Sequence, residues 1–203
     1  MTPLGLPVVT ALLGSLPSPS RNGISLGPFD LRFYGLMIEL GVIAAVWLFG
    51  RLLEEHRVGN SDDATSIAIW GVAAGVLGAR AYHVVTDWSR FSDDLGSIPQ
   101  IWKGGLGIPG GLLVGILVGA WQARVRHIRP AVAVTFAMPA IALAQAIGRW
   151  GNWFNQELFG LPTDMPWGLE IDPGNSAIPV GLPEGTLFHP TFLYEIVWNV
   201  AGV

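Results

Sequence analysis

The feature that most constrains the fold of this chain is a set of apolar stretches with almost no charge. Four of them approach the ~20 apolar residues that are needed to cross the ~30 Å hydrocarbon core of a membrane. Only 13% of the 203 residues are charged and 51% are hydrophobic, whereas soluble domains carry about 25% charged residues. The expected spans cover residues 33–50, 65–85, 108–123 and 130–148, and a fifth apolar segment begins near Leu187.

We therefore expect an all-α fold, a polytopic integral membrane helix bundle with four full spans plus the start of a fifth, inside which the sequence stops. Helices that are apolar all round suit lipid or a bundle interior, because each satisfies its own backbone polar groups. Residues 1–28 lack the basic start of a secretory signal and are interrupted by proline, which favours an extracytoplasmic segment on or near the membrane. Residues 29–203 are expected to form the transmembrane domain.

Charge and cysteine content exclude several classes of function. The net charge of −4 is small and unclustered, which gives no support for a nucleic-acid partner. The chain has no cysteine, so disulfides, thiolate metal sites and a cysteine nucleophile are excluded. The loop at 124–129 has three arginines and no acid, which marks it as cytoplasmic. Counting spans from that loop places residues 51–64 inside and the loops around 87–107 and 150–186 outside.

A polar stretch at residues 148–160 follows the fourth apolar segment. Ionisable groups near or inside a bilayer are candidates for function, and Arg149 is the first of them here. If the helix continues through the stretch, Gln145, Arg149, Asn152 and Gln156 share one stripe by their i, i+3 and i+4 spacing. The alternative is an interfacial belt, in which tryptophans anchor at the lipid headgroups and Arg149 touches phosphate. Open backbone for a bulky ligand is expected beside the stripe at Gly148, Gly151 and Gly160.

The stretch 148–160 resembles the signature of the prolipoprotein diacylglyceryl transferases, Gly-Arg-x-Gly-Asn-(aromatic)-x-Asn-x-Glu-Leu-x-Gly, at every fixed position. Residues 189–195, His-Pro-Thr-Phe-Leu-Tyr-Glu, are similar to the family's His-Pro-Ser/Thr-x-Leu-Tyr-Glu block. Residues 32–36 and 75–80 are also similar to segments of the family. The resemblance therefore runs from about residue 25 to the last residue, in the family's order.

The resemblance implies a reaction at the outer leaflet of the bacterial cytoplasmic (inner) membrane. A diacylglyceryl group passes from phosphatidylglycerol, a membrane lipid, to the lipobox cysteine thiol of a prolipoprotein, which forms a thioether and releases glycerol phosphate. Negative charge grows on the departing phosphodiester, and the planar fork of a guanidinium pairs with phosphate oxygens. Arg149 fits this role. Arg80 is the second candidate, with a structural pair to Glu39 as the equal alternative.

Other residues of the similar motifs receive expected roles from the same resemblance. Asn152 and Asn155 can hydrogen-bond headgroup hydroxyls or phosphate. Glu157 can orient Arg149 or bind the glycerol headgroup, against the alternative of an idle exposed acid, and Tyr34 can donate to phosphate, against a tyrosine of the interfacial belt. The expected catalytic residues are Arg149, Asn152, Glu157 and Tyr34. The expected substrate-binding residues are Arg149, Asn155, Gly151, Gly160, Arg80, His189, Tyr194 and Glu195.

The base that activates the thiol is left open. A thiolate attacks rather than a thiol, and many family members carry a histidine immediately before the Gly-Gly of the third span. That position is Pro109 here. Either the histidine is not indispensable as the base, or another group such as His83 or His189 substitutes, or this chain is impaired. No metal or organic cofactor is implied, because no cluster has metal-ligand spacing and phosphatidylglycerol is itself the activated donor. Family members continue for further spans, so the transferase domain at 29–203 is expected to be incomplete at its C-terminus.

The sequence leaves two other functions open. One is a small membrane transporter, in which Glu39, Arg80, Gln145 and Arg149 line the path of the transported substrate. The other is a membrane protein that binds lipid headgroups without transferring them. Transporters built from inverted repeats have two similar halves, which this sequence does not show. The repeat of glycines every four residues from Gly111 to Gly119 favours close helix packing, with a polar exit for the substrate headgroup as the other interpretation.

Overall fold

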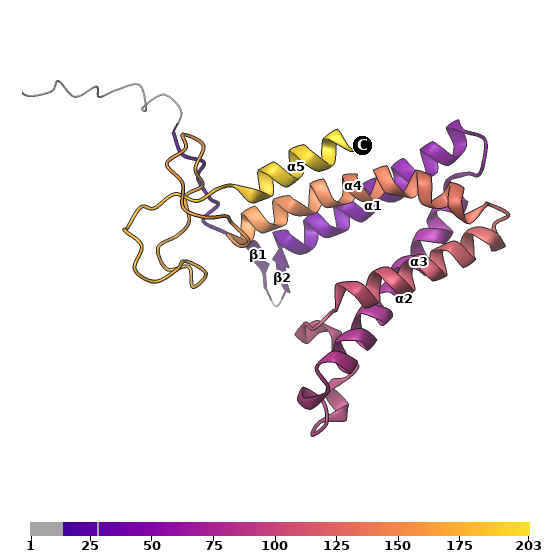
Figure 1. Ribbon diagram of the computed structural model, residues 1–203, viewed down its shortest axis with the longest axis horizontal. Coiled ribbons are helices and arrows are strands. Elements are labelled where there is room, and N and C mark those ends of the chain that lie inside the picture. The colour runs from indigo at the N-terminus through magenta and orange to yellow at the C-terminus, as the bar shows by residue number, and fades with distance from the viewer. Residues whose placement is uncertain (1–13, 28) are drawn as a thin grey trace, which may run out of the picture. The chain divides into compact units, whose positions relative to one another are not determined.

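The computed structural model describes residues 14–27 and 29–203 (Figure 1). The described chain is mostly helical, and four of its helices are long and apolar enough to cross a membrane. The protein is therefore an all-α, multi-pass membrane protein, as the four apolar stretches predicted. These helices are α1 (Phe33–Glu55), α2 (Ser61–Thr86), α3 (Ile108–Val125) and α4 (Pro130–Asn155).

The other elements are short. Helix α5 (Thr191–Ala201) follows Pro190 and has 11 residues. Strands β1 (Gly23–Leu26) and β2 (Phe29–Arg32) form an antiparallel hairpin in which Gly23 is opposite Arg32. Three single-turn 3₁₀ helices lie between α2 and α3: η1 (Trp88–Arg90), η2 (Leu95–Ser97) and η3 (Ile101–Lys103).

The N-terminal segment contains structure that the sequence did not predict. Its last residues contain β1, and β2, the second strand of the hairpin, leads directly into α1. Upstream of it, the backbone N–H of Leu16 donates to Gly168 O (2.9 Å) and Leu16 O accepts from Glu170 N (2.9 Å). Residues 1–13 and 28 of this segment lie outside the described residues. The expected extracytoplasmic position of residues 1–28, on or near the membrane, stays a prediction.

The chain divides into two compact units, and α1 and α4 each contribute to both. One unit consists of Ala45–Ala140. Its core contains buried residues of four helices, among them Leu53, Ala64 and Ala123, each with 0% exposure. At one end of this unit Asn60 and Asp63 form a capping box that starts α2, and Arg126 pairs with Asp63 at 3.5 Å.

Glycines let α2 and α3 approach closely within this unit. A Cβ added at Gly78 would lie 2.6 Å from Gly110 O, and one at Gly115 would lie 3.1 Å from Gly71 O. Small residues that allow backbones to approach are the usual contact between membrane helices. The close packing predicted from the glycine repeat is therefore present, with the glycines of α2 forming the other side of the contact.

The other unit contains the described residues up to Ala44 together with Ile141–Val203. The first part of α1 and the last part of α4 run antiparallel in it, since Phe33 packs against Phe154 with the rings tilted by 52° (centroids 4.8 Å apart) and Gly41 faces Ala144. Helix α5 lies along α4 (Figure 1), with Phe192 against Trp150 at 5.8 Å. The segment from 156 to 190, which is rich in Pro and Gly, contains no helix or strand.

Candidate active site

The candidate site is built on the last two turns of α4. This helix continues to Asn155, seven residues beyond the predicted end of the span, so the polar stretch is helical as far as that residue. Arg149 and Asn152 therefore lie one turn apart on the same face, and Arg149 Nη1 donates to Asn152 Oδ1 at 3.2 Å. Gln156 is the first residue past the helix and has a positive φ of 50°, so it leaves the expected stripe.

Two carboxylates close the network around Arg149. Helix α5 supplies Glu195, whose Oε2 lies 2.5 Å from Arg149 Nη2. Glu157, just past the end of α4, accepts from Asn152 Nδ2 at 2.9 Å and from Asn155 Nδ2 at 3.3 Å. The result is a continuous chain of five side chains in the order Glu195, Arg149, Asn152, Glu157 and Asn155.

Burial differs along this chain of side chains. Asn152 is 5% exposed, while the side chains of Arg149 and Glu195 are 33% and 44% exposed. The buried amide is held by groups on both sides, and the ion pair stays accessible to water or a ligand. A guanidinium has five N–H donors, and the described contacts of Arg149 use only Nη1 and Nη2. The remaining donors of Arg149 can therefore bind an additional anion.

The space beside two glycines of the motif is occupied by other protein atoms. A Cβ added at Gly151 would lie 2.7 Å from Tyr34 Cδ2, and one at Gly160 would lie 2.9 Å from His189 Cβ. The open backbone expected at these two positions is therefore occupied, because Tyr34 and the segment before α5 pack there. Gly148 has no atom within 4 Å of an added Cβ and matches the expectation.

His189 and Tyr194 form a second polar group in the same unit. His189 Nδ1 lies 3.0 Å from Tyr194 Oη, and Trp167 Nε1 donates to the same hydroxyl at 2.8 Å. The backbone of His189 is fixed as well, since its carbonyl accepts from Gly160 N at 2.9 Å. Trp167 was not among the predicted site residues, and nothing in its Pro- and Gly-rich surroundings marks it locally. No hydrogen bond among the described residues joins this group to Arg149.

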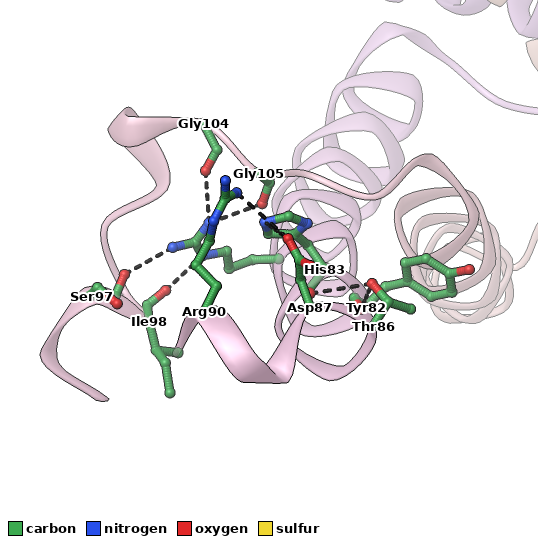
Figure 2. A network of polar contacts seen from close by, with 10 residues as sticks. Tyr82, His83, Thr86, Asp87, Arg90, Ser97, Ile98, Gly104 and Gly105 are labelled. Atoms are coloured by element: carbon green, nitrogen blue, oxygen red, sulfur yellow. Dashed lines mark hydrogen bonds and ion pairs between the residues drawn. The ribbon is translucent and has the colours of Figure 1, made fainter. Parts of the chain in front are cut away.

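Arg80 belongs to the other unit and has partners of its own there. Its side chain is 7% exposed and lies over the Phe91 ring, with Cζ 5.0 Å from the centroid. The acceptors for its guanidinium are backbone carbonyls. These contacts involve neither a phosphate nor Glu39, the two partners expected from the sequence. Its guanidinium donates to four backbone carbonyls: Ser97 O (2.8 Å), Ile98 O (2.7 Å), Gly104 O (2.7 Å) and Gly105 O (3.0 Å). These four acceptor residues are labelled in Figure 2.

The residues considered for the base lie in different surroundings. Pro109 sits in the first turn of α3, a position where its missing N–H costs nothing. His83 follows Arg80 by one turn in α2, and its Nε2 lies 3.8 Å from Asp87 Oδ2 (Figure 2). A Cβ added at Gly105 would lie 2.4 Å from that imidazole, so the loop backbone covers it. His189 is the only histidine of the unit that contains Arg149.

Comparison with known proteins gives one consistent family. Residues 22–203 match the family model described as prolipoprotein diacylglyceryl transferase. Proteins named phosphatidylglycerol–prolipoprotein diacylglyceryl transferase are similar across most of the chain. They include those of Streptomyces griseus (49% identical; 93% of this chain and 57% of the relative), Mycobacterium leprae (46%; 93% and 61%) and Bifidobacterium adolescentis (42%; 94% and 60%). The chain thus spans about 60% of the length of these curated relatives.

Proposed function

The chain belongs to the prolipoprotein diacylglyceryl transferase family, and we propose that this protein transfers the diacylglyceryl group of phosphatidylglycerol to the lipobox cysteine thiol of a prolipoprotein. In this reaction the sulfur bonds to the glyceryl carbon of the lipid. The bond between that carbon and its phosphate oxygen breaks, and glycerol phosphate leaves with the electron pair. The thiol gives its proton to a base, and the product is a thioether.

The observation that carries this proposal is the Arg149 network. The phosphate group gains negative charge as it departs, and hydrogen-bond donors aimed at developing charge lower the barrier most where water is excluded. Arg149 offers a planar fork for two phosphate oxygens. Asn152 fixes one side of that fork, and Glu195 from α5 fixes the other. A bound phosphate would use the free donors of Arg149 or take the place of the half-exposed Glu195 carboxylate.

The other motif residues support Arg149 in this proposal. Glu157 acts on Arg149 through Asn152, because it accepts from the amide whose oxygen faces the guanidinium. Tyr34 packs against Gly151, one residue before Asn152, and is proposed to donate its hydroxyl to phosphate. His189 and Tyr194 are proposed to contact the substrates, with their orientation set by Trp167 and Gly160.

We place the reaction at the outer leaflet of the bacterial cytoplasmic membrane. The arginine-rich turn between α3 and α4 favours the cytoplasmic side. Helix α4 spans the membrane once, so its C-terminal end with Arg149 is then on the opposite side. Secreted prolipoproteins present their lipobox cysteine at that side. The partners proposed for the site are therefore phosphatidylglycerol in the surrounding lipid and the lipobox peptide.

The test is transfer to a lipobox peptide by membranes that contain the full reading frame and phosphatidylglycerol. Mass spectrometry should show a gain of one diacylglyceryl unit, and a peptide with Cys→Ser at the acceptor should show none. A working relative assayed in parallel is the control for substrate quality. An unmodified peptide beside an active control would refute the proposed activity.

A further inference from the structure

Three of the long helices end in the same way, with a residue of positive φ that is not glycine. These residues are Arg57 after α1, His127 after α3 and Gln156 after α4, with φ of 55°, 59° and 50°. At each end the N–H of this residue donates to the carbonyl three residues back, and the next N–H donates to the carbonyl five residues back. This pattern is the Schellman motif, in which glycine is the usual residue because it adopts positive φ without strain. Each of the three side chains is therefore present at some conformational cost.

The end of α4 differs from the other two in the pair of side chains that the motif brings together. An apolar contact usually joins the residue after the positive-φ position to the residue five before it. Both positions are apolar at the ends of α1 and α3: Val58 with Leu53, and Ile128 with Ala123. At the end of α4 they are Glu157 and Asn152, which are joined by a hydrogen bond of 2.9 Å. The turn that ends α4 therefore sets the geometry of the Arg149 network.

Gln156 is also the one buried residue among the three. Arg57 and His127 are exposed, which suits basic side chains at helix C-termini, whereas Gln156 is 7% exposed. Its Nε2 donates to Asp172 Oδ2 at 2.7 Å and to Pro19 O at 3.1 Å, and its Oε1 accepts from Asp172 N at 2.7 Å. These hydrogen bonds tie the turn to the N-terminal segment and to the loop that contains Asp172.

The N-terminal segment is suited to this contact because proline has no N–H. Pro17 and Pro19 offer only carbonyls, and the end of α4 supplies the donors. Trp153 Nε1 donates to Pro17 O at 3.2 Å, one turn before the residue that donates to Pro19 O. Leu16 pairs through its own N–H and C=O with the backbone of residues 168–170. The segment is thus fixed both to the loop and to the last turn of α4, within one compact unit.

We propose that Gln156 is a positioning residue for the transferase reaction, which acts through the turn on Glu157. Glu157 in turn orients Asn152, the residue that holds Arg149. This inference rests on the proposed function. A displacement of about 1 Å at a reacting group can lower a rate by about 10²-fold. The side-chain hydrogen bonds of Gln156 restrain the turn against such a displacement, and they offset the cost of its positive φ.

Gln156→Gly tests the proposal without disturbing the turn itself, because glycine is the residue that the motif favours. Peptide transfer is measured per folded molecule, as kcat and as KM for phosphatidylglycerol. We expect kcat to fall about tenfold or more while KM stays within about threefold, the pattern of a group misplaced for the transition state. Gln156→Glu keeps the length of the side chain but offers no donor when ionised, and it should show the same loss.

His127→Gly is the matched control. It makes the same backbone change at the same position of the motif, but it removes an exposed side chain. We expect kcat to stay at the wild-type value. Wild-type kcat in Gln156→Gly as well would overturn the inference.

Dependence on Glu157 separates positioning from general loosening of the fold. In a Glu157→Gln background, the addition of Gln156→Gly should lower kcat by less than about twofold, because the residue that Gln156 positions is already altered. An equal loss in both backgrounds would show that Gln156 does not act through Glu157, and would overturn the inference.

Trypsin cleavage after Arg21 gives a readout that does not depend on activity. Arg21 is exposed and lies two residues past Pro19, so release of the N-terminal segment should speed this cleavage in Gln156→Gly but not in His127→Gly. Cleavage at the wild-type rate in Gln156→Gly would show that Gln156 does not hold the segment, and would overturn the inference. A wild-type protein that transfers no diacylglyceryl group would instead refute the proposed function.

Discussion

Two arginines are candidates for phosphate binding from the sequence, Arg80 within the second expected span and Arg149 directly after the fourth, yet their surroundings in the structure differ. Arg80 is buried and donates to four backbone carbonyls. Arg149 is one-third exposed and contacts two side chains from two helices. A guanidinium bound to backbone carbonyls is part of the fold, because its release would leave buried acceptors unsatisfied. A guanidinium bound to side chains can exchange them for a ligand, since a side chain can rotate away.

Arg149→Ala should give the largest effect on activity. We expect transfer to fall by about 10²–10³-fold, the usual result of removing one donor that stabilises developing charge. The fold should persist, because Glu195 is half-exposed and is solvated when its partner is lost. Arg149→Lys should also lose most activity, since an ammonium does not reproduce the fork. The measurement is the rate of peptide modification, and near-normal turnover in the lysine variant would contradict a bidentate phosphate contact.

Arg80→Ala should act on stability first. Loss of the side chain removes four donors from the loop between α2 and α3, and we expect a destabilisation of about 3 kcal/mol, part of the loss being offset by water. Limited proteolysis should show early cleavage between residues 97 and 105, with a lower melting temperature in detergent. Arg80→Lys should behave almost as poorly, because one ammonium does not reach all four carbonyls. Wild-type proteolysis and melting in Arg80→Ala would show that the loop does not depend on this side chain.

Gly110→Ala tests the helix pair that carries Arg80. The added Cβ would lie 2.3 Å from Tyr82 Cβ and 2.4 Å from Gly78 O, so α2 and α3 must separate, at a cost of about 1–3 kcal/mol. The matched control on the same helix is Gly119→Ala, where the nearest atom is Ile67 Cγ2 at 3.9 Å. Thermal unfolding of both variants in detergent should separate them. Equal melting temperatures would mean that the glycine contact is not needed for the helix pair.

The sequence predicted the spans well because a membrane imposes one strong requirement, about 20 apolar residues in a helix. The spans at 33–50 and 108–123 begin at the first residues of α1 and α3. Helix α4 continues beyond the predicted end of the fourth span, since hydropathy falls at Arg149 while helical hydrogen bonding continues to Asn155. The four-residue strands of the hairpin were missed because their pattern is too short to be distinguished from a loop.

The site could be predicted only where its residues are neighbours in sequence. Helical spacing indicated that Arg149 and Asn152 share a face, and their hydrogen bond confirms it. Glu195 was expected in the site, but its pairing with Arg149 was not, because that contact depends on how α5 packs along α4. The carbonyls around Arg80 have no sequence signature at all, since any residue can supply a backbone oxygen to a folded loop.

The measurement that tests this contrast most directly is transfer per folded molecule in Arg80→Ala and Arg149→Ala, assayed side by side at low temperature. Folded protein is quantified by protease resistance or by gel filtration in detergent. We predict that Arg80→Ala, corrected for its folded fraction, keeps activity within about tenfold of wild type, while Arg149→Ala stays about 10²–10³-fold lower after the same correction. A folded Arg80→Ala protein as inactive as Arg149→Ala would contradict the account, because Arg80 would then take part in the chemistry.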